Sequence, residues 1–366
     1  MRGQWLGSYE GSTTGKIMIN IDEVEDHFEG VAYLHPELSE IPGTVAYFRT
    51  DNKEINHSVE AATFPIDPRT GFQSTWEEIK QFFPGSSHST KADAKFNVGG
   101  DNLTVEATTD IGVELSAALS RPPRNSKTKI LGKKMSWNKF KDYVGKISKS
   151  GYLFRGQQQP WPLCTSFHRR GRYRISEFTS KDVRQLHQRL SAITNHYFEL
   201  SVPDQNGAFF NLLQHHGYPT PLLDWSYSPY VAAFFAFRDR PIGFKGKGPV
   251  RIYLFNNREW QKRYRQIQNL DPAFPHLSVM EFISIDNPRL VPQQAVTTVT
   301  NIHDIEAYLL KKEEETDVSF LEAIDIPAKE REEAMTDLRF MGITAGSMFP
   351  SIDGVCEELR ERNFAM

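Results

Sequence analysis

The feature that most constrains the fold is a change of hydrophobic period near residue 120. Before it, short runs such as Lys16–Ile21 alternate polar and apolar residues, and turn residues such as Gly99–Asn102 separate them. After it, apolar residues recur at helical spacing over longer stretches. The two patterns call for different packing, and a length of 366 residues also favours two domains.

The first domain is predicted to cover residues 1–120 and to be a small all-β sandwich or barrel. Further strand-like runs lie at residues 27–34, 43–48, 95–98 and 103–107, and one helix is expected around residues 76–83. We expect this domain to hold a protein partner or to sense a trigger.

A basic stretch follows this domain. Arg121, Arg124, Lys127 and Lys134 belong to a run of basic residues and prolines without an acid, which is typical of a linker and which we place at residues 121–135. A solvated connector and a contact with a partner or a phosphate backbone both stay open. The formal net charge of −3 argues against a strongly basic protein surface but does not exclude nucleic-acid binding.

The second domain is predicted at residues 136–366, with a mixed α/β fold. Ser136 is suited to cap a helix whose apolar face carries Trp137, Phe140 and Val144. Strands are expected at residues 151–154 and 250–255, and helices at residues 181–200, 208–216 and 229–237. The fold class predicted for the whole chain is therefore α+β.

The cysteine content bears on the compartment. Cys164 and Cys356 are the two cysteines, and they show no CxxC or Cys/His zinc spacing. This argues for a reducing compartment, so we expect a cytoplasmic protein with neither a disulfide framework nor a structural metal. The N-terminus lacks a signal-peptide core, and no stretch approaches the roughly 20 apolar residues of a membrane helix, so we expect no membrane role.

The first candidate for chemistry is the segment Phe154-Arg155-Gly156-Gln157, where an arginine follows an apolar strand and a glycine permits close approach of a ligand. A partly buried guanidinium needs an anionic partner. That partner is either a carboxylate of the protein or a phosphate or carboxylate of a ligand, and the sequence leaves both open.

Two hydroxyl residues and a second basic group follow this segment. Thr165 and Ser166 suit the oxygens of a ribose or a phosphate, but they also suit a helix cap or a turn. The basic group is interpreted as solvated or paired with nearby acids, and its members are Arg169, Arg170, Arg172 and Arg174.

A turn at the end of a predicted helix carries His215, His216 and, a few residues later, Asp224. The two histidines point about 100° apart on a helix and cannot easily share a metal, so we expect none there. For each histidine, a capping or core hydrogen bond and catalysis stay open. A Ser166–His216–Asp224 hydrolase site is a weak reading, because no GxSxG motif is present.

A last candidate lies before a strand-like stretch near residue 295. Arg289 and the amides of Gln293 and Gln294 can read a base or a ribose, or simply make surface hydrogen bonds.

These segments together resemble the FRG domain, named for its Phe-Arg-Gly core. The resemblance extends over residues 136–362, and its main motifs are Tyr152-Leu153-Phe154-Arg155-Gly156-Gln157, Thr165-Ser166, Gln214-His215-His216-Gly217, Leu222-Leu223-Asp224-Trp225 and Asn287-Pro288-Arg289. The sequence departs from the family pattern at Pro221 and at Ala295-Val296. FRG domains accompany defence or toxin systems in bacterial and phage genomes, so the resemblance implies a fold more than a reaction.

A more distant likeness is to ADP-ribosyltransferases, in which an early arginine, a Ser/Thr motif and a late Gln or Glu follow in this order. That likeness implies that Arg155 pairs with the pyrophosphate or ribose of NAD and that Ser166 supports the nicotinamide pocket. Gln293-Gln294 stand where the catalytic Glu is expected, and Asp224 is a candidate to replace it.

The function expected from these resemblances is that of a defence or toxin effector that cleaves NAD or transfers its ADP-ribose. The expected catalytic residues are Arg155, Asp224, His216 and Gln294. The expected NAD-binding residues are Arg155, Gly156, Gln157, Thr165, Ser166, His215, Arg289 and Gln293. Two alternatives stay open: a module that binds a nucleotide or ADP-ribose without turnover, and a metal-dependent nuclease that uses the two histidines and Asp224.

Overall fold

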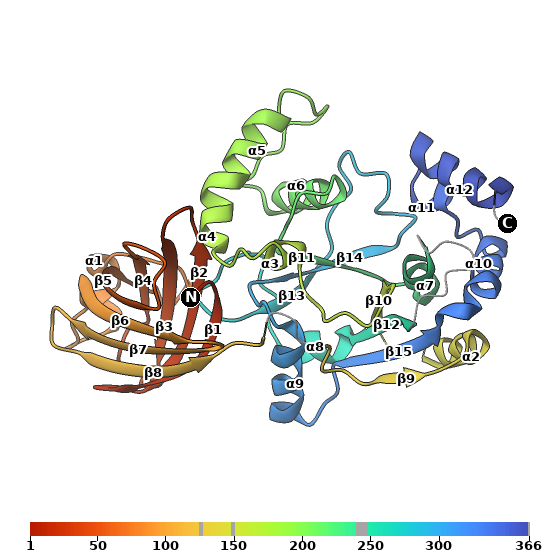
Figure 1. Cartoon of the computed structure of the whole chain (residues 1–366). Helices are drawn as coiled ribbons and strands as arrows, with labels where there is room; N and C mark the ends of the chain where they lie inside the picture. Colours follow the sequence, from red (N-terminus) through yellow and green to blue (C-terminus); the bar gives the residue numbers. More distant parts are fainter. Residues whose placement is uncertain (124–126, 148–150, 239–247, 365–366) are drawn as a thin grey trace.

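The computed structural model describes residues 1–123, 127–147, 151–238 and 248–364. The chain folds into an antiparallel barrel, at the left of Figure 1, and a mixed sheet flanked by helices, at the right. The predicted α+β class and the predicted all-β N-terminal domain are both confirmed, and the barrel is the form that the β domain takes.

The barrel is a meander in which each strand pairs with the next and β8 pairs back with β1. Its strands are β1 (Gly3–Gly11), β2 (Gly15–Glu23), β3 (Phe28–Pro36), β4 (Thr44–Arg49), β5 (Asn56–Pro65), β6 (Lys91–Gly99), β7 (Asn102–Thr109) and β8 (Glu114–Ser120). Burial alternates along β5 and β6, as expected for strands with one face inside and one in solvent. Inward residues such as Trp5, Phe48 and Phe96 form the core of the barrel.

A short helical segment lies between β5 and β6, where the sequence predicts a helix. It consists of α1 (Trp76–Ile79) and η1 (Lys80–Phe82). The carboxylate of Glu78 accepts a hydrogen bond from the Thr75 amide and so caps the start of α1.

Part of the predicted linker is tied to the second sheet. Residues 132–134 form strand β9, which pairs in parallel with β15 (Leu321–Pro327). Glu306 accepts hydrogen bonds from Thr128 and from the Lys129 amide. Residues 124–126 of the predicted linker lie outside the described residues. A three-residue strand such as Gly132–Lys134 carries no hydrophobic alternation, which is why the sequence pattern does not predict it.

The second sheet has, in the described part of the chain, the strand order β13-β14-β11-β10-β12-β15-β9, and all neighbours are antiparallel except β15 and β9. Its remaining strands are β10 (Tyr152–Gln157), β11 (Leu222–Ser226), β12 (Pro249–Asn256), β13 (Leu277–Met280) and β14 (Ala295–Thr300). No helix among the described residues is long and apolar enough to cross a membrane.

The helices of this domain cover both faces of the sheet. They are α2 (Trp137–Ile147), α3 (Ser166–Arg169), α4 (Ile175–Glu177), the π-helical turn η2 (Phe178–Asp182), α5 (Val183–Leu190), α6 (Pro203–His215), α7 (Pro229–Phe237), α8 (Asn257–Arg263), α9 (Ile305–Thr316), η3 (Ala328–Glu330), α10 (Arg331–Phe340), α11 (Ala345–Met348) and α12 (Ile352–Phe364). Helices α2, α7 and α10 contribute to one hydrophobic core with β10, β12 and β15. A second core, with α8 and α9, lies on the other face.

The helix predicted over residues 181–200 ends at Leu190. The Ser191 hydroxyl donates to the His187 carbonyl and the Thr194 hydroxyl donates to the Leu190 carbonyl, so side chains satisfy carbonyls at this helix end. The prediction was wrong there because the spacing of apolar residues does not show that hydroxyl groups bond the carbonyls at this helix end.

The barrel packs with its outer wall against the second domain. Met18, Val31 and Tyr33 of β2 and β3 point out of the barrel and lie in one hydrophobic cluster with Ala273. Polar contacts support this packing, because the Gln4 amide donates to the Asn301 carbonyl at 2.6 Å. The two domains are therefore in direct contact through side chains as well as through the linker.

Candidate functional site

The site begins where the second sheet opens. Strand β10 pairs with β12 along its whole length, but it pairs with β11 at one position, Phe154 with Ser226. Beyond that pair, Nη1 of Arg155 donates to the Asp224 carbonyl at 2.6 Å. In a continuous antiparallel ladder, a backbone amide of the neighbouring strand would donate to this carbonyl. Here the Arg155 side chain donates instead, and a crevice lies between the two strands.

Strand alternation decides which face each residue of β10 uses. Phe154 lies in the core that contains α7, and Gly156 lies on the same face. A Cβ at Gly156 would stand 1.8 Å from the Ala232 carbonyl oxygen, so only glycine allows α7 to pack this closely. Arg155 and Gln157 therefore belong to the opposite face, inside the crevice.

Arg155 is a charged group that forms no salt bridge within the described residues. Burial lowers the pKa of its guanidinium to about 10, although the nearby charge of Asp224 raises it, and the group is still protonated at neutral pH. In the described part of the chain, its Nε is sealed from solvent and has no hydrogen-bond partner, and the same holds for Oε1 of Gln157. Among the described residues, no carboxylate forms an ion pair with Arg155. The protein therefore leaves a cation and an acceptor unsatisfied side by side.

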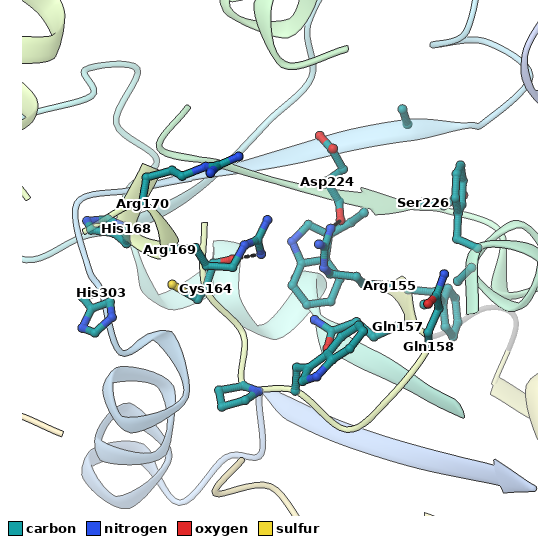
Figure 2. Close-up of a pocket in the computed structure, with 18 of the residues that line it drawn as sticks. Arg155, Gln157, Gln158, Cys164, His168, Arg169, Arg170, Asp224, Ser226 and His303 are labelled. Carbon is teal, nitrogen blue, oxygen red and sulfur yellow. Dashed lines mark hydrogen bonds between the residues drawn. The ribbon is translucent and has the colours of Figure 1, made fainter. Parts of the chain in front are cut away.

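These groups face a cavity of about 1080 Å³. Its walls come from β10, β11, α3, the start of β14, and two residues near the ends of the barrel domain, Arg2 and Pro123. Figure 2 shows the part of this wall that carries Arg155, Gln157, Arg169 and Asp224. The volume is slightly above the range of about 300–1,000 Å³ usual for sites of small-molecule ligands.

The wall is rich in cations besides Arg155. Arg169 and Arg170 are exposed on the cavity side of α3, and Nη1 of Arg169 donates to the Cys164 carbonyl at 2.7 Å, the bond dashed in Figure 2. Arg238 is neutralised by a two-bond pair with Glu357, and Arg2 lies 3.4 Å from Glu23. Among the described residues, the wall arginines without a salt bridge are thus Arg155 and the two at the end of α3.

Asp224 is the one carboxylate among the described residues of the wall. Figure 2 shows its carboxyl group pointing away from the Arg155 guanidinium, although its backbone carbonyl accepts from that guanidinium. His215 also lines the cavity, and burial lowers its pKa below the ordinary value, so its imidazole is neutral at pH 7. Its Nε2 is buried and has no hydrogen-bond partner among the residues that the structure describes.

An aromatic ring completes the wall. Trp161 lies in the segment between β10 and α3 and is 49% exposed, which is unusual for so large an apolar side chain. An exposed indole at the rim of a cationic cavity offers a flat surface on which a ring of a ligand can stack.

Thr165 and Ser166 have structural partners. Thr165 is the N-cap of α3, since its Oγ1 accepts from the His168 amide. The Ser166 hydroxyl donates to the Thr220 carbonyl and accepts from the Thr220 amide, which ties α3 to the turn before β11. Neither residue lines the cavity, but α3, which they hold, carries Arg169 and Arg170 into its wall.

The late candidates are spread around the site. Gln293 lines the cavity, and its side-chain amide donates to the Met348 carbonyl, whereas Gln294 is exposed with a left-handed backbone at φ 46°. Arg289 reaches the His215 carbonyl at 3.4 Å, next to the wall. His216 is exposed and lines a separate pocket with Leu190 and neighbouring residues.

The structure adds wall residues that sequence reasoning did not select. Trp161 and Arg2 gave no signal, and Arg169 and Arg170 were interpreted as solvated or paired. Of the four clustered arginines, Arg172 pairs with Asp182 and Arg174 with Glu29, as acids near them allow. The sequence signal that could have indicated the place of Arg169 and Arg170 is their position at the end of one helical turn that follows a Thr cap.

Other chemistry finds little support in the wall. Burial raises the pKa of the Cys164 thiol to about 12, so this cysteine is not a thiolate at neutral pH. Within the described ranges, no three His, Cys, Asp or Glu side chains are grouped as metal ligands would be.

Comparison with known proteins places the site in a family. No curated protein matches the chain. Residues 150–242 match the model of the FRG domain, a range that contains β10, α3, α6, β11 and α7 and with them both Arg155 and Asp224. The match covers both strands at the sheet opening, whereas wall residues such as Arg2, Gln293 and His303 lie outside it. The chain therefore carries an FRG domain at residues 150–242.

Proposed function

We propose that the cavity at the sheet opening binds NAD and that the protein consumes it, by cleavage or by ADP-ribosyl transfer, as a defence or toxin effector. The observation that carries the proposal is Arg155, a charged side chain with a sealed Nε and no carboxylate partner in the described structure. Leaving a partly buried cation unpaired costs up to several kcal/mol, and an anionic ligand such as a diphosphate lowers that cost.

The surroundings of Arg155 favour a dinucleotide over a simple anion. Arg169 and Arg170 extend the cationic wall, and Trp161 offers a stacking surface at its rim. The free acceptor of Gln157 suits a ribose hydroxyl. A cavity of about 1080 Å³ has room for phosphates, ribose and a ring together.

Asp224 is the residue we assign to catalysis. NAD would bring the glycosidic bond and the nicotinamide leaving group. The protein would supply a carboxylate that stabilises the oxocarbenium-like ribosyl cation. The neutral imidazole of His215 lies in the same wall and can accept a proton from an attacking hydroxyl or water.

Binding without turnover is the second candidate, and one observation favours it. Asp224 is the one carboxylate in the described wall, and its carboxyl group points away from Arg155. A metal-dependent nuclease gains no comparable support, because His216 lines a different pocket.

The test is incubation of the purified full chain with NAD, with nicotinamide and ADP-ribose followed by chromatography. We expect Asp224→Asn to abolish nicotinamide release while NAD binding persists, and Arg155→Lys to lower kcat/KM by about tenfold or more. Arg184→Gln, an exposed arginine on α5, is the matched control and should behave like the unchanged protein.

The outcomes separate the two candidates. Saturable NAD binding without nicotinamide release would support the binding module and contradict the enzyme hypothesis. Release that survives in a folded Asp224→Asn variant would remove Asp224 from the mechanism. Absence of both binding and release would overturn the proposal.

A further inference from the structure

We propose that the interior of the N-terminal barrel is a binding site for a small, uncharged, apolar molecule. The strands enclose a cavity of about 140 Å³ beside the filled part of the core. Inward residues of several strands line it, among them Ile17, Ile19, Ala61, Phe96 and Val105. Antiparallel barrels of about eight strands have interiors that are either filled by side chains or left with room for one small ligand.

The burial pattern locates the unfilled end. Inward residues at one end of the barrel, such as Trp5 and Leu103, are completely buried. At the other end, Leu34, Ala107 and Leu115 belong to the same inner surface but are only partly buried. The cavity is lined by Leu34, Ala107 and Leu115 but not by Trp5 or Leu103, so it lies at this end of the barrel, where we place its entrance.

The entrance lies among chain segments that connect strands. The lining includes Thr13 between β1 and β2, Ile41 between β3 and β4, Ser87 before β6, and Ile111 between β7 and β8. The second domain packs against outward residues of β2 and β3. The cavity is thus formed by the barrel alone and is independent of the Arg155 site.

The chemistry of the lining selects the ligand. No Asp, Glu, Lys or Arg lines the cavity among the described residues. The polar groups at the entrance bond to one another, because His88 contacts the Thr44 hydroxyl at 3.1 Å and the Ser89 carbonyl at 2.6 Å. Burial lowers the pKa of His88, so the ring is neutral. A charged ligand would lose its hydration without gaining a counter-ion, so an uncharged one is favoured.

The volume sets the size of the ligand. An engineered cavity of about 150 Å³ in another protein stays dry and accepts benzene. The barrel cavity is of similar size and is lined by side chains of the same kind, with the rings of Tyr9, Phe48 and Phe96 on its wall. A single aromatic ring or a short alkyl chain fits this space.

The test is a titration of the full chain with fluorobenzene, followed by ¹⁹F NMR line broadening and chemical shift. Ala61→Leu places a larger side chain into the cavity, and Ala62→Leu places the same side chain on the exposed outer face of the same strand. We expect saturable binding by the unchanged protein and by Ala62→Leu, and at least a tenfold loss of affinity in Ala61→Leu. Arg155→Lys should bind fluorobenzene normally, which distinguishes this site from the sheet opening.

A second variant keeps the test decisive if Ala61→Leu does not fold. Ala107→Leu lies nearer the entrance at a partly buried position, and it should lower the affinity in the same way. No saturable binding by the unchanged protein would overturn the proposal. Unchanged affinity in a folded Ala61→Leu or Ala107→Leu variant would also overturn it.

Discussion

Asp271 is a carboxyl group at the contact between the two domains. It accepts a hydrogen bond from the Tyr33 hydroxyl of the barrel at 3.1 Å. Burial raises its pKa from 3.8 to about 6. The folded state therefore holds the Asp271 proton more tightly than the unfolded state does.

This shift predicts a pH-dependent effect of Asp271→Asn. Between pH 4 and 6 the folded state binds more protons at Asp271 than the unfolded state, so the stability of the unchanged protein falls as pH rises through this window. The variant does not titrate there. We expect its free energy of unfolding, relative to the unchanged protein, to increase by roughly 2 kcal/mol between pH 4.5 and 7.5.

Urea denaturation at the two pH values measures this difference. A difference between the two proteins that is the same at pH 4.5 and at pH 7.5 would contradict the assignment.

Single residues also show how far sequence reasoning reaches. The place of Arg155 at the partly buried end of an apolar strand follows from the local pattern. The partners of Thr165 do not, because a hydroxyl suits a helix cap and a ligand equally well until the fold puts the His168 amide beside it. Trp161 looks like any core aromatic in the sequence, and only the fold leaves it exposed.

At the scale of elements, Glu306 of α9 joins segments that are far apart in the chain. It is 1% exposed and accepts hydrogen bonds from Thr128 and Lys129 of the linker, the Leu163 amide and the Tyr253 hydroxyl. One carboxylate thus fixes the linker, the segment before α3 and the central strand β12.

We predict that Glu306→Ala lowers the free energy of unfolding by about 3 kcal/mol, because several buried donors lose their acceptor together. Glu306→Gln keeps one acceptor oxygen and should cost less. Glu314→Ala, at an exposed position of the same helix, should change stability by no more than about 0.5 kcal/mol. Chemical denaturation compares the three variants, and equal effects of Glu306→Ala and Glu314→Ala would contradict the prediction.

Elements with a strong period were predictable from the sequence, and those without one were not. Strand β2 and helix α7 lie where their patterns place them. Strand β9 is too short for a period, and the end of α5 depends on hydroxyl caps. The sheet opening between β10 and β11 has no local signal at all, because it is a relation between two strands about 70 residues apart.

At the scale of the whole molecule, the barrel supports one wall of the site. The end of α3 carries Arg169 and Arg170 into the cavity wall, and residues shortly after it contact the barrel. Asp22 accepts from the Tyr173 amide, and Glu29 pairs with Arg174. Because the cationic wall and the barrel share this short segment, the two domains cannot separate without disturbing the site.

We propose that Arg155 forms no salt bridge within the described residues because a dinucleotide supplies its anionic partner. The most direct measurement is calorimetric titration of the full chain with NAD, at low and high salt, for the unchanged protein and for Arg155→Lys and Arg184→Gln. We expect the affinity for NAD to fall as the salt concentration rises. We also expect Arg155→Lys to bind NAD at least tenfold more weakly than the unchanged protein, and Arg184→Gln to bind it equally well. Equal affinity of the unchanged protein and a folded Arg155→Lys variant, or no binding by either, would contradict it.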